Sequence, residues 1–170
     1  MNKSSAILAL TLIIITTGCG TNKYTTRMHS QIKKHKLEKE EVVVLVDYKD
    51  SWLSNRFFIV NPTQKTIIFQ AKTGHAYKTG AFYATEFSNV PNSKKSSLGL
   101  YKIGRQYVGK FGKSLKLHGL SKTNSNVYKR FIVLHGCNCT HSIGCIVLDH
   151  EFMPRILKVL KKGTRMVVYK

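Results

Sequence analysis

Residues 135–145 gather reactive side chains within a short distance along the chain. They read His-Gly-Cys-Asn-Cys-Thr-His-Ser-Ile-Gly-Cys and contain three cysteines and two histidines. A cysteine becomes nucleophilic as a thiolate, and a histidine within hydrogen-bond reach can take its proton. The glycine before Cys145 permits a tight turn that brings a backbone N–H close to a carbonyl under attack. This segment therefore predicts Cys145 as a nucleophile and His135 as its general base.

The same segment allows other chemistry. Four of its cysteines and histidines could close a tetrahedral zinc site, although their Cys-x-Cys and His-x3-Cys spacing is not that of paired Cys-x2-Cys knuckles. A disulfide from Cys137 or Cys139 to Cys145 would block the nucleophile, whereas a Cys137–Cys139 bond would leave it free. A buried thiol that only packs as a small apolar group is a further alternative.

Apolar runs on both sides of this segment predict the strands that position it. Residues 130–134 lead in and residues 146–148 lead out, and both runs have strand chemistry. A loop between two buried strands is a common place for catalytic groups. Further strands are expected over residues 42–46, 56–61, 65–72, 82–87, 98–103, 114–117 and 164–169, with a hairpin turn at 61–64.

A single helix is expected near the C-terminus of the chain. Residues 149–162 place apolar side chains along one stripe, with Asp149 as the N-cap and Gly163 as the stop. The pattern shows neither βαβ alternation nor an internal repeat. The predicted fold class is therefore mostly β, a barrel or sandwich with one C-terminal helix.

Charge and composition narrow the choice of partner. The 170 residues include 28 Lys and Arg against 8 Asp and Glu, a formal net charge of +20, and 42% are hydrophobic. The hydrophobic fraction is sufficient for a packed core, and the length suits one domain with a short extension. The charge favours a polyanionic partner such as nucleic acid, anionic lipid or an acidic envelope polymer.

The N-terminal residues predict export. A basic start is followed by an apolar run over residues 6–15 that is too short to span a bilayer comfortably, and then by Thr-Thr-Gly-Cys ending at Cys19. We expect residues 1–18 to be a lipoprotein-type signal peptide, Cys19 to be lipidated, and residues 19–41 to form a basic tether. The protein would then reside in the periplasm or cell envelope on a membrane lipid anchor, which disfavours nucleic acid as a partner.

Several short motifs together carry a family resemblance. They are Phe-Ser-Asn-Val-Pro at 87–91, Ser-Ser-Leu-Gly at 96–99, Leu-His-Gly-Leu at 117–120, Val-Leu-His-Gly at 133–136 and Ser-Ile-Gly-Cys at 142–145. In this order they resemble the murein L,D-transpeptidase catalytic domain family, the YkuD-like enzymes, over residues 42–170. The resemblance implies a β-rich fold and a cysteine that attacks the L,D amide linkage of a peptidoglycan stem peptide, with no cofactor or metal.

The resemblance also implies roles for individual residues. Cys145 is the nucleophile and His135 the general base, while the backbone carbonyl of Gly136 orients the histidine. Ser142, Gly144 and the backbone around Cys145 shape the oxyanion hole. Beyond the family roles, His118 and His141 are candidates for the substrate cleft, and His75 is either a surface histidine or part of that cleft.

The sequence departs from the family pattern around the proposed nucleophile. The spacing from His135 to Cys145 is short, Ile143 stands where many members have histidine or tryptophan, and Val147 stands where many have arginine. Cys137 and Cys139 have no counterpart. Two alternatives to the enzyme stay open: a cell-wall-binding lipoprotein that has lost activity, and a Cys/His zinc-binding module.

Overall fold

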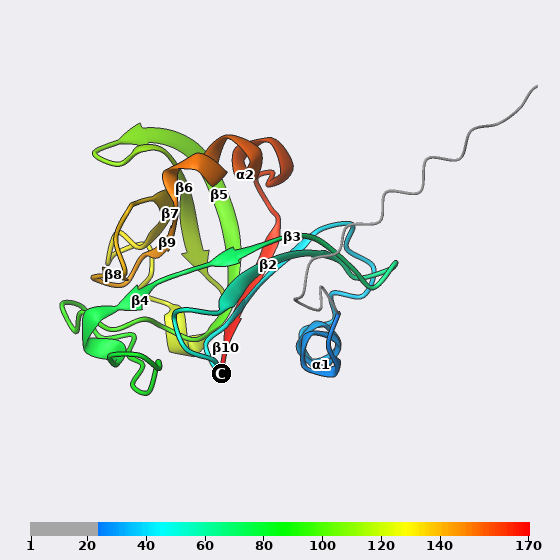
Figure 1. Ribbon diagram of the computed structural model, residues 1–170, viewed down its shortest axis with the longest axis horizontal. Helices are drawn as coiled ribbons and strands as arrows, with labels where there is room; N and C mark the ends of the chain where they lie inside the picture. Colours follow the sequence, from blue (N-terminus) through cyan, green and yellow to red (C-terminus); the bar gives the residue numbers. More distant parts are fainter. Residues whose placement is uncertain (1–23) are drawn as a thin grey trace, which may run out of the picture.

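The computed structural model describes residues 24–170 (Figure 1). The predicted signal peptide and the predicted lipidation site, Cys19, lie outside the described residues. Among residues 24–170, no helix combines the length and the apolar character needed to cross a membrane.

One eight-stranded mixed sheet makes up most of the fold. Its order is β3-β2-β1-β10-β5-β6-β7-β9, and neighbours run antiparallel except for the parallel pairs β1/β10 and β7/β9. The strands are β1 (Val43–Asp47), β2 (Asn55–Asn61), β3 (Thr66–Lys72), β5 (Gly99–Gly109), β6 (Gly112–Gly119), β7 (Val133–Gly136), β9 (Ile146–Leu148) and β10 (Arg165–Tyr169). Two short strands, β4 (His75–Ala76) and β8 (His141–Ser142), pair separately. The mostly β prediction is confirmed.

The sheet curls around its main core. Phe69 of β3 and Ile146 of β9 come from opposite edges of the sheet, yet both belong to the same buried cluster. In a flat sheet of eight strands these edges would lie about 33 Å apart. The sheet must therefore fold back on itself, and Ile156 of helix α2 (Met153–Val159) packs into the same core.

The hairpin predicted around residues 61–64 is present between β2 and β3. The side chain of Asn61 accepts a hydrogen bond from the backbone N–H of Gln64 at 2.9 Å, which closes the turn. The strand predicted over residues 82–87 is absent, because this segment turns irregularly and leaves the rings of Phe82 and Tyr83 exposed. Aromatic residues raise strand propensity only where the rings pack against neighbouring strands.

Part of the segment predicted as a basic tether is folded. Helix α1 (Thr26–Lys34) begins where the Thr25 side chain accepts a hydrogen bond from the N–H of Met28 at 3.2 Å. Met28 and Ile32, four residues apart, are buried against Val43 and other side chains on the outer face of the sheet. Figure 1 shows α1 and α2 on opposite sides of the central strands.

The C-terminal helix is confirmed in position but shorter than predicted. A turn of 3-10 helix, η3 (His150–Phe152), leads into α2, and Asp149 makes no side-chain cap bond. Pro154 occupies the first turn of α2, where its missing N–H has no intrahelical partner to lose. Leu160 is extended, so the helix ends before Gly163.

Candidate active site

Strands β7 and β9 place His135 and Cys145 on the same face of the sheet. The two strands are parallel, with His135 opposite Val147, so Cys145 lies level with Val133. Side chains alternate between the two faces of a strand. The side chains of Leu134 and Ile146 point to the opposite face from His135 and belong to the main core. Cys145, Val133 and Val147 form a small apolar cluster on the other face.

His135 and Cys145 line one cavity of about 750 Å³, which we call the cysteine cavity. Cys145 immediately precedes β9, so the β7/β9 register extended by one residue sets it diagonally from His135, at about 8 Å between Cα atoms. The other residues that line the cysteine cavity include Tyr77, Phe111, Arg130, Phe131, His141, Ser142 and Ile143. The geometry therefore brings the predicted nucleophile and base to one open cavity.

The hydrogen bond of His135 fixes its tautomer. Nδ1 lies 2.9 Å from the carbonyl oxygen of Gly136, and a carbonyl only accepts, so Nδ1 carries the proton. Nε2 is then left with a lone pair that can accept a proton. Burial lowers the pKa of His135, nearby His150 lowers it further, and the hydrogen bond to Gly136 partly opposes both. The imidazole is thus neutral at neutral pH, as a general base must be.

Cys145 is the free cysteine of the described residues, and it is buried. Burial raises the pKa of its thiol, and a hydrogen bond from the Val133 backbone and the positive charge of Arg130 oppose that rise. The thiol points its hydrogen toward the carbonyl oxygen of Phe131, with a sulfur to oxygen distance of 3.8 Å. The resting site therefore holds a protonated thiol beside a neutral imidazole, and the nucleophile forms only when a base removes the proton.

Ser142 and Gly144 build the turn that presents Cys145. The Ser142 hydroxyl accepts from the N–H of Gly144 at 3.0 Å and donates to the carbonyl of Cys145 at 2.8 Å. Gly144 has a φ of +138°, and a Cβ there would come within 2.5 Å of Ile132 Cδ1. Because the N–H of Gly144 is committed to Ser142, the part of both residues in oxyanion binding stays a prediction.

Arg130 is a site residue that sequence reasoning missed. Its guanidinium donates to the carbonyl oxygens of Ser88 at 2.8 Å and Lys95 at 2.6 Å, and to the hydroxyl of Ser97 at 2.7 Å. These bonds hold the loop of residues 88–97, which carries two of the motifs described above, against the cysteine cavity. In a chain with 28 basic residues, no local pattern distinguishes this arginine from a surface cation.

Cys137 and Cys139 are joined in a disulfide, so Cys145 remains free. The N–H of Cys137 donates to Leu148 O at 2.7 Å, which continues the β7/β9 register beyond Gly136. Cys137 then lies four residues farther along the strands than Cys145, about 13 Å. A disulfide requires Cα atoms within about 7 Å, so Cys137 and Cys145 cannot bond without backbone movement.

The disulfide also weakens the zinc alternative. Two of the five candidate ligands of residues 135–145 are consumed in it. Within residues 24–170, no group of three or more His, Cys, Asp or Glu side chains is arranged to hold a metal ion.

The three additional histidines do not share one location. His75 is fully buried, with Nδ1 3.2 Å from Arg56 Nη1 and Nε2 2.9 Å from the carbonyl oxygen of Gly80, so both of its nitrogens are engaged in the fold. His118 lines a separate cavity beside β5 and β6. Only His141 lines the cysteine cavity. His75 and His118 therefore do not line this cavity, and their part in a substrate cleft stays a prediction.

Comparisons with known proteins agree with the fold. The sequence matches the family model of the L,D-transpeptidase catalytic domain over residues 19–169. The crystal structure of an L,D-transpeptidase from Stackebrandtia nassauensis matches with a TM-score of 0.52 and 13% identity, covering 78% of this chain and 57% of that one. The helical cell shape determining protein Pgp2 from Campylobacter jejuni matches with a TM-score of 0.54 and 16% identity, covering 76% and 47%.

The chain spans about half the length of the two solved structures, and at these identities the likeness concerns the fold alone. A comparison with curated protein sequences finds no match.

Proposed function

Because the chain belongs to the family of L,D-transpeptidase catalytic domains, we propose that it acts on peptidoglycan stem peptides through an acyl-enzyme on Cys145. The single observation that carries this proposal is the placement of His135 and Cys145. His135 lies on β7 and Cys145 immediately precedes the parallel strand β9, and both line one cavity, with the histidine in the tautomer that leaves Nε2 free.

The first step forms a thioester. His135 Nε2 takes the thiol proton, and the Cys145 sulfur attacks the carbonyl carbon of an L,D amide bond in the stem peptide. The amide C–N bond breaks, and His135 returns the proton to the departing amine. Backbone N–H groups in the turn of residues 142–145 are the candidate donors to the oxyanion, and one such donor is worth about 3–4 kcal/mol.

The second step resolves the thioester. An acceptor amine attacks the thioester carbonyl and gives a proton to His135, while the C–S bond breaks and Cys145 leaves as a thiolate that recovers the proton. Water in place of the amine would give hydrolysis.

We further propose that the protein is exported and anchored by a lipid on Cys19. The basic start, the apolar run and the Thr-Thr-Gly-Cys sequence support this proposal, and a peptidoglycan substrate lies outside the cytoplasmic membrane. The mass of the protein purified from membranes tests it. A Cys19→Ser variant should lose both the lipid mass and the membrane association.

The proposed activity is tested by incubating the purified protein with a disaccharide-tetrapeptide muropeptide and following the products by mass spectrometry. Wild type should give a crosslinked dimer or a trimmed stem, and Cys145→Ala and His135→Ala should give neither. His118→Ala, a histidine variant outside the cysteine cavity, is the matched control and should retain activity. Runs with and without reductant show whether the Cys137–Cys139 bond matters.

The two alternatives make opposite predictions in the same experiment. An inactive wall-binding protein would leave muropeptides unchanged in every variant while still binding the cell wall. If the purified protein contained zinc and showed no turnover, the result would support the zinc-binding module over the enzyme.

A further inference from the structure

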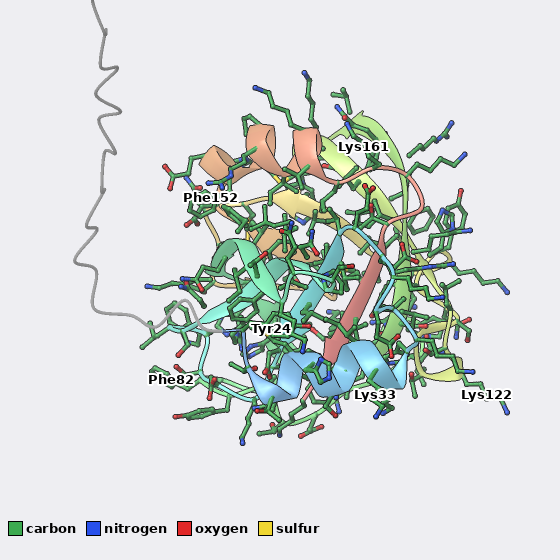
Figure 2. All side chains as sticks on the ribbon, turned by 90° about the vertical axis from the view of Figure 1, so that its right-hand side faces the viewer. Tyr24, Lys33, Phe82, Lys122, Phe152 and Lys161 are labelled. Atoms are coloured by element: carbon green, nitrogen blue, oxygen red, sulfur yellow. A yellow bond between two sulfur atoms is a disulfide. The ribbon has the colours of Figure 1, made fainter. Side chains whose placement is uncertain are left out.

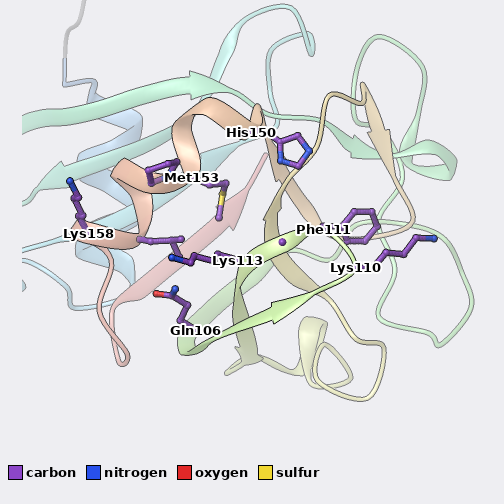
Figure 3. Close-up of a pocket in the computed structure, with 10 residues that line it drawn as sticks. Gln106, Lys110, Phe111, Lys113, His150, Met153 and Lys158 are labelled. Atoms are coloured by element: carbon purple, nitrogen blue, oxygen red, sulfur yellow. The ribbon is translucent and has the colours of Figure 1, made fainter.

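A second cavity lies between the β5–β6 hairpin and α2 (Figure 3). It has a volume of about 670 Å³, and we call it the lysine cleft. Met153, Pro154 and Leu157 give it an apolar wall, and Lys113 and Lys158 give it positive charge. Figure 3 shows these two lysines toward one end of the cleft, and His150 and Phe111 toward the other. The end with Phe111 and His150 is the aromatic end, and it also carries Lys110, whose Nζ lies 6.0 Å from the centroid of the Phe111 ring.

The positive charge of the lysine cleft has no counter-charge within it. None of the residues that line the cleft is acidic. Residues 87–148, which include the whole β5–β6 hairpin, contain neither Asp nor Glu. Lysines gathered on an apolar wall without carboxylates favour an anionic ligand that also has apolar parts.

The aromatic end of the lysine cleft adjoins the proposed general base. Phe111 lines both the lysine cleft and the cysteine cavity, and its ring stacks on His135 with centroids 4.0 Å apart. His150 lies against the residue that follows His135, because a Cβ added to Gly136 would come within 2.6 Å of His150 Nδ1. The two cavities thus meet at His135, with the Phe111 ring between them.

Resting on the function proposed above, we propose that the lysine cleft binds the acyl acceptor, an amine-bearing peptide with free carboxylates. Its carboxylates would pair with Lys113 and Lys158, and its amine would pass Phe111 to reach His135. There the amine gives its proton to His135 as it attacks the thioester on Cys145, which leaves as a thiolate. The donor occupies the cysteine cavity, so the two substrates approach the shared base from opposite sides of the hairpin tip.

The hairpin tip is able to yield for this approach. Phe111 lies between Gly109 and Gly112, and Gly112 has a φ of +73° with no neighbour within 4 Å of an added Cβ. Phe111 as a whole residue is 42% exposed. A displacement of Phe111 would part its ring from His135, and the flanking glycines give the tip the backbone freedom for that movement.

The test separates acylation from transfer. The donor is a tetrapeptide stem, and the acceptor is a tripeptide stem supplied either with free carboxyl groups or as the carboxamide. Formation of the acyl-enzyme from donor alone is read from the mass of the intact protein, and transfer is read from the mass of the product. Wild type should favour the carboxylate acceptor by about five- to tenfold, as expected for two partly solvated ion pairs.

Charge reversal identifies the site. Lys113→Glu with Lys158→Glu should acylate Cys145 at the wild-type rate and lose the preference for the carboxylate acceptor. Lys122→Glu with Lys161→Glu is the matched control, since it changes net charge equally at exposed lysines outside the cleft and should keep the preference (Figure 2). Lys113→Gln with Lys158→Gln gives the same comparison without introduced acids.

The possible failures are distinct. Normal acylation with an unchanged acceptor preference in both cleft variants would overturn the lysine cleft as the acceptor site and leave the proposed function standing. Equal loss of preference in the control would assign the effect to net charge and also overturn the site. A wild-type protein that never acylates Cys145 would overturn both proposals.

Discussion

The ring of Phe111 stacks on the imidazole of His135, with centroids 4.0 Å apart and planes inclined by 14°. The contact joins the tip of the β5–β6 hairpin to the end of β7, strands that are otherwise linked through the pairing of β6 with β7. It covers one face of the proposed base. The hairpin tip therefore contributes to the burial that keeps the imidazole neutral.

Removal of this cover should shift the pH dependence of acylation. Burial is the main cause that lowers the pKa of His135, so Phe111→Ala should raise that pKa toward its ordinary value. The imidazole would then become protonated at a higher pH, and the acid limb of the rate profile should shift to higher pH. The rate of acyl-enzyme formation measured against pH checks this prediction.

A control separates local from general effects of losing an aromatic ring. Phe82 is also an exposed aromatic residue, but it does not line the cysteine cavity. Phe82→Ala should leave the acid limb where it is in wild type. An acid limb that does not move in Phe111→Ala would show that the ring does not contribute to the burial of His135.

Gly144→Ala should abolish acylation and destabilise the fold. A side chain at a φ of +138° is strained by about 1–3 kcal/mol, and its Cβ would also meet Ile132 Cδ1 at 2.5 Å. Gly112→Ala is the matched control, because that position has a positive φ but open space around an added Cβ. The free energy of unfolding, measured by urea denaturation, should fall further in Gly144→Ala than in Gly112→Ala, and the difference reports the steric clash. Equal losses would mean that Ile132 moves aside.

The proposed nucleophile and base could be predicted from sequence because their placement is local. Two short apolar runs flank residues 135–145, and their β-branched and aliphatic residues identify strands without knowledge of the rest of the chain. Once both strands are given, a shared face for His135 and Cys145 depends only on register. The register itself, and the parallel pairing of β7 with β9, came from the structure.

Other parts of the site depend on contacts between distant segments. Phe111 precedes His135 by 24 residues and lies in an ordinary hairpin turn, so its sequence context gives no sign of the stacking. Arg130 contacts a loop more than 30 residues earlier in the chain. The sequence indicated at most a partly helical tether before β1, because only two apolar residues mark the buried side of α1. Their burial depends on the apolar outer face that Val43 and Leu45 give to β1.

Arg130→Met should loosen the loop of residues 88–97. The variant keeps much of the apolar stem but removes hydrogen bonds from a charged donor, which are worth about 1.5–3 kcal/mol in a half-buried setting. It also removes the positive charge that lowers the pKa of the Cys145 thiol, so that pKa should rise. The rate of alkylation by iodoacetamide as a function of pH should therefore shift to higher pH.

Arg105→Met is the control for this variant. Arg105 is exposed and lines the separate cavity that contains His118. Its replacement changes the net charge by the same amount as the replacement of Arg130. Its alkylation profile should match that of wild type. A shift of the same size in both variants would attribute the effect to net charge rather than to the position of Arg130.

Ile32→Ala tests whether helix α1 belongs to the catalytic domain. Ile32 is 1% exposed and packs with Val43 and Tyr169 on the outer face of the sheet. Truncation of a buried isoleucine typically costs about 2–5 kcal/mol, so the urea midpoint should fall well below that of wild type. Lys33→Ala, at the exposed neighbouring position, should change the free energy of unfolding by no more than about 0.5 kcal/mol. If both variants unfolded at the wild-type midpoint, residues 26–34 would be an independent tether, and the folded domain would begin at β1.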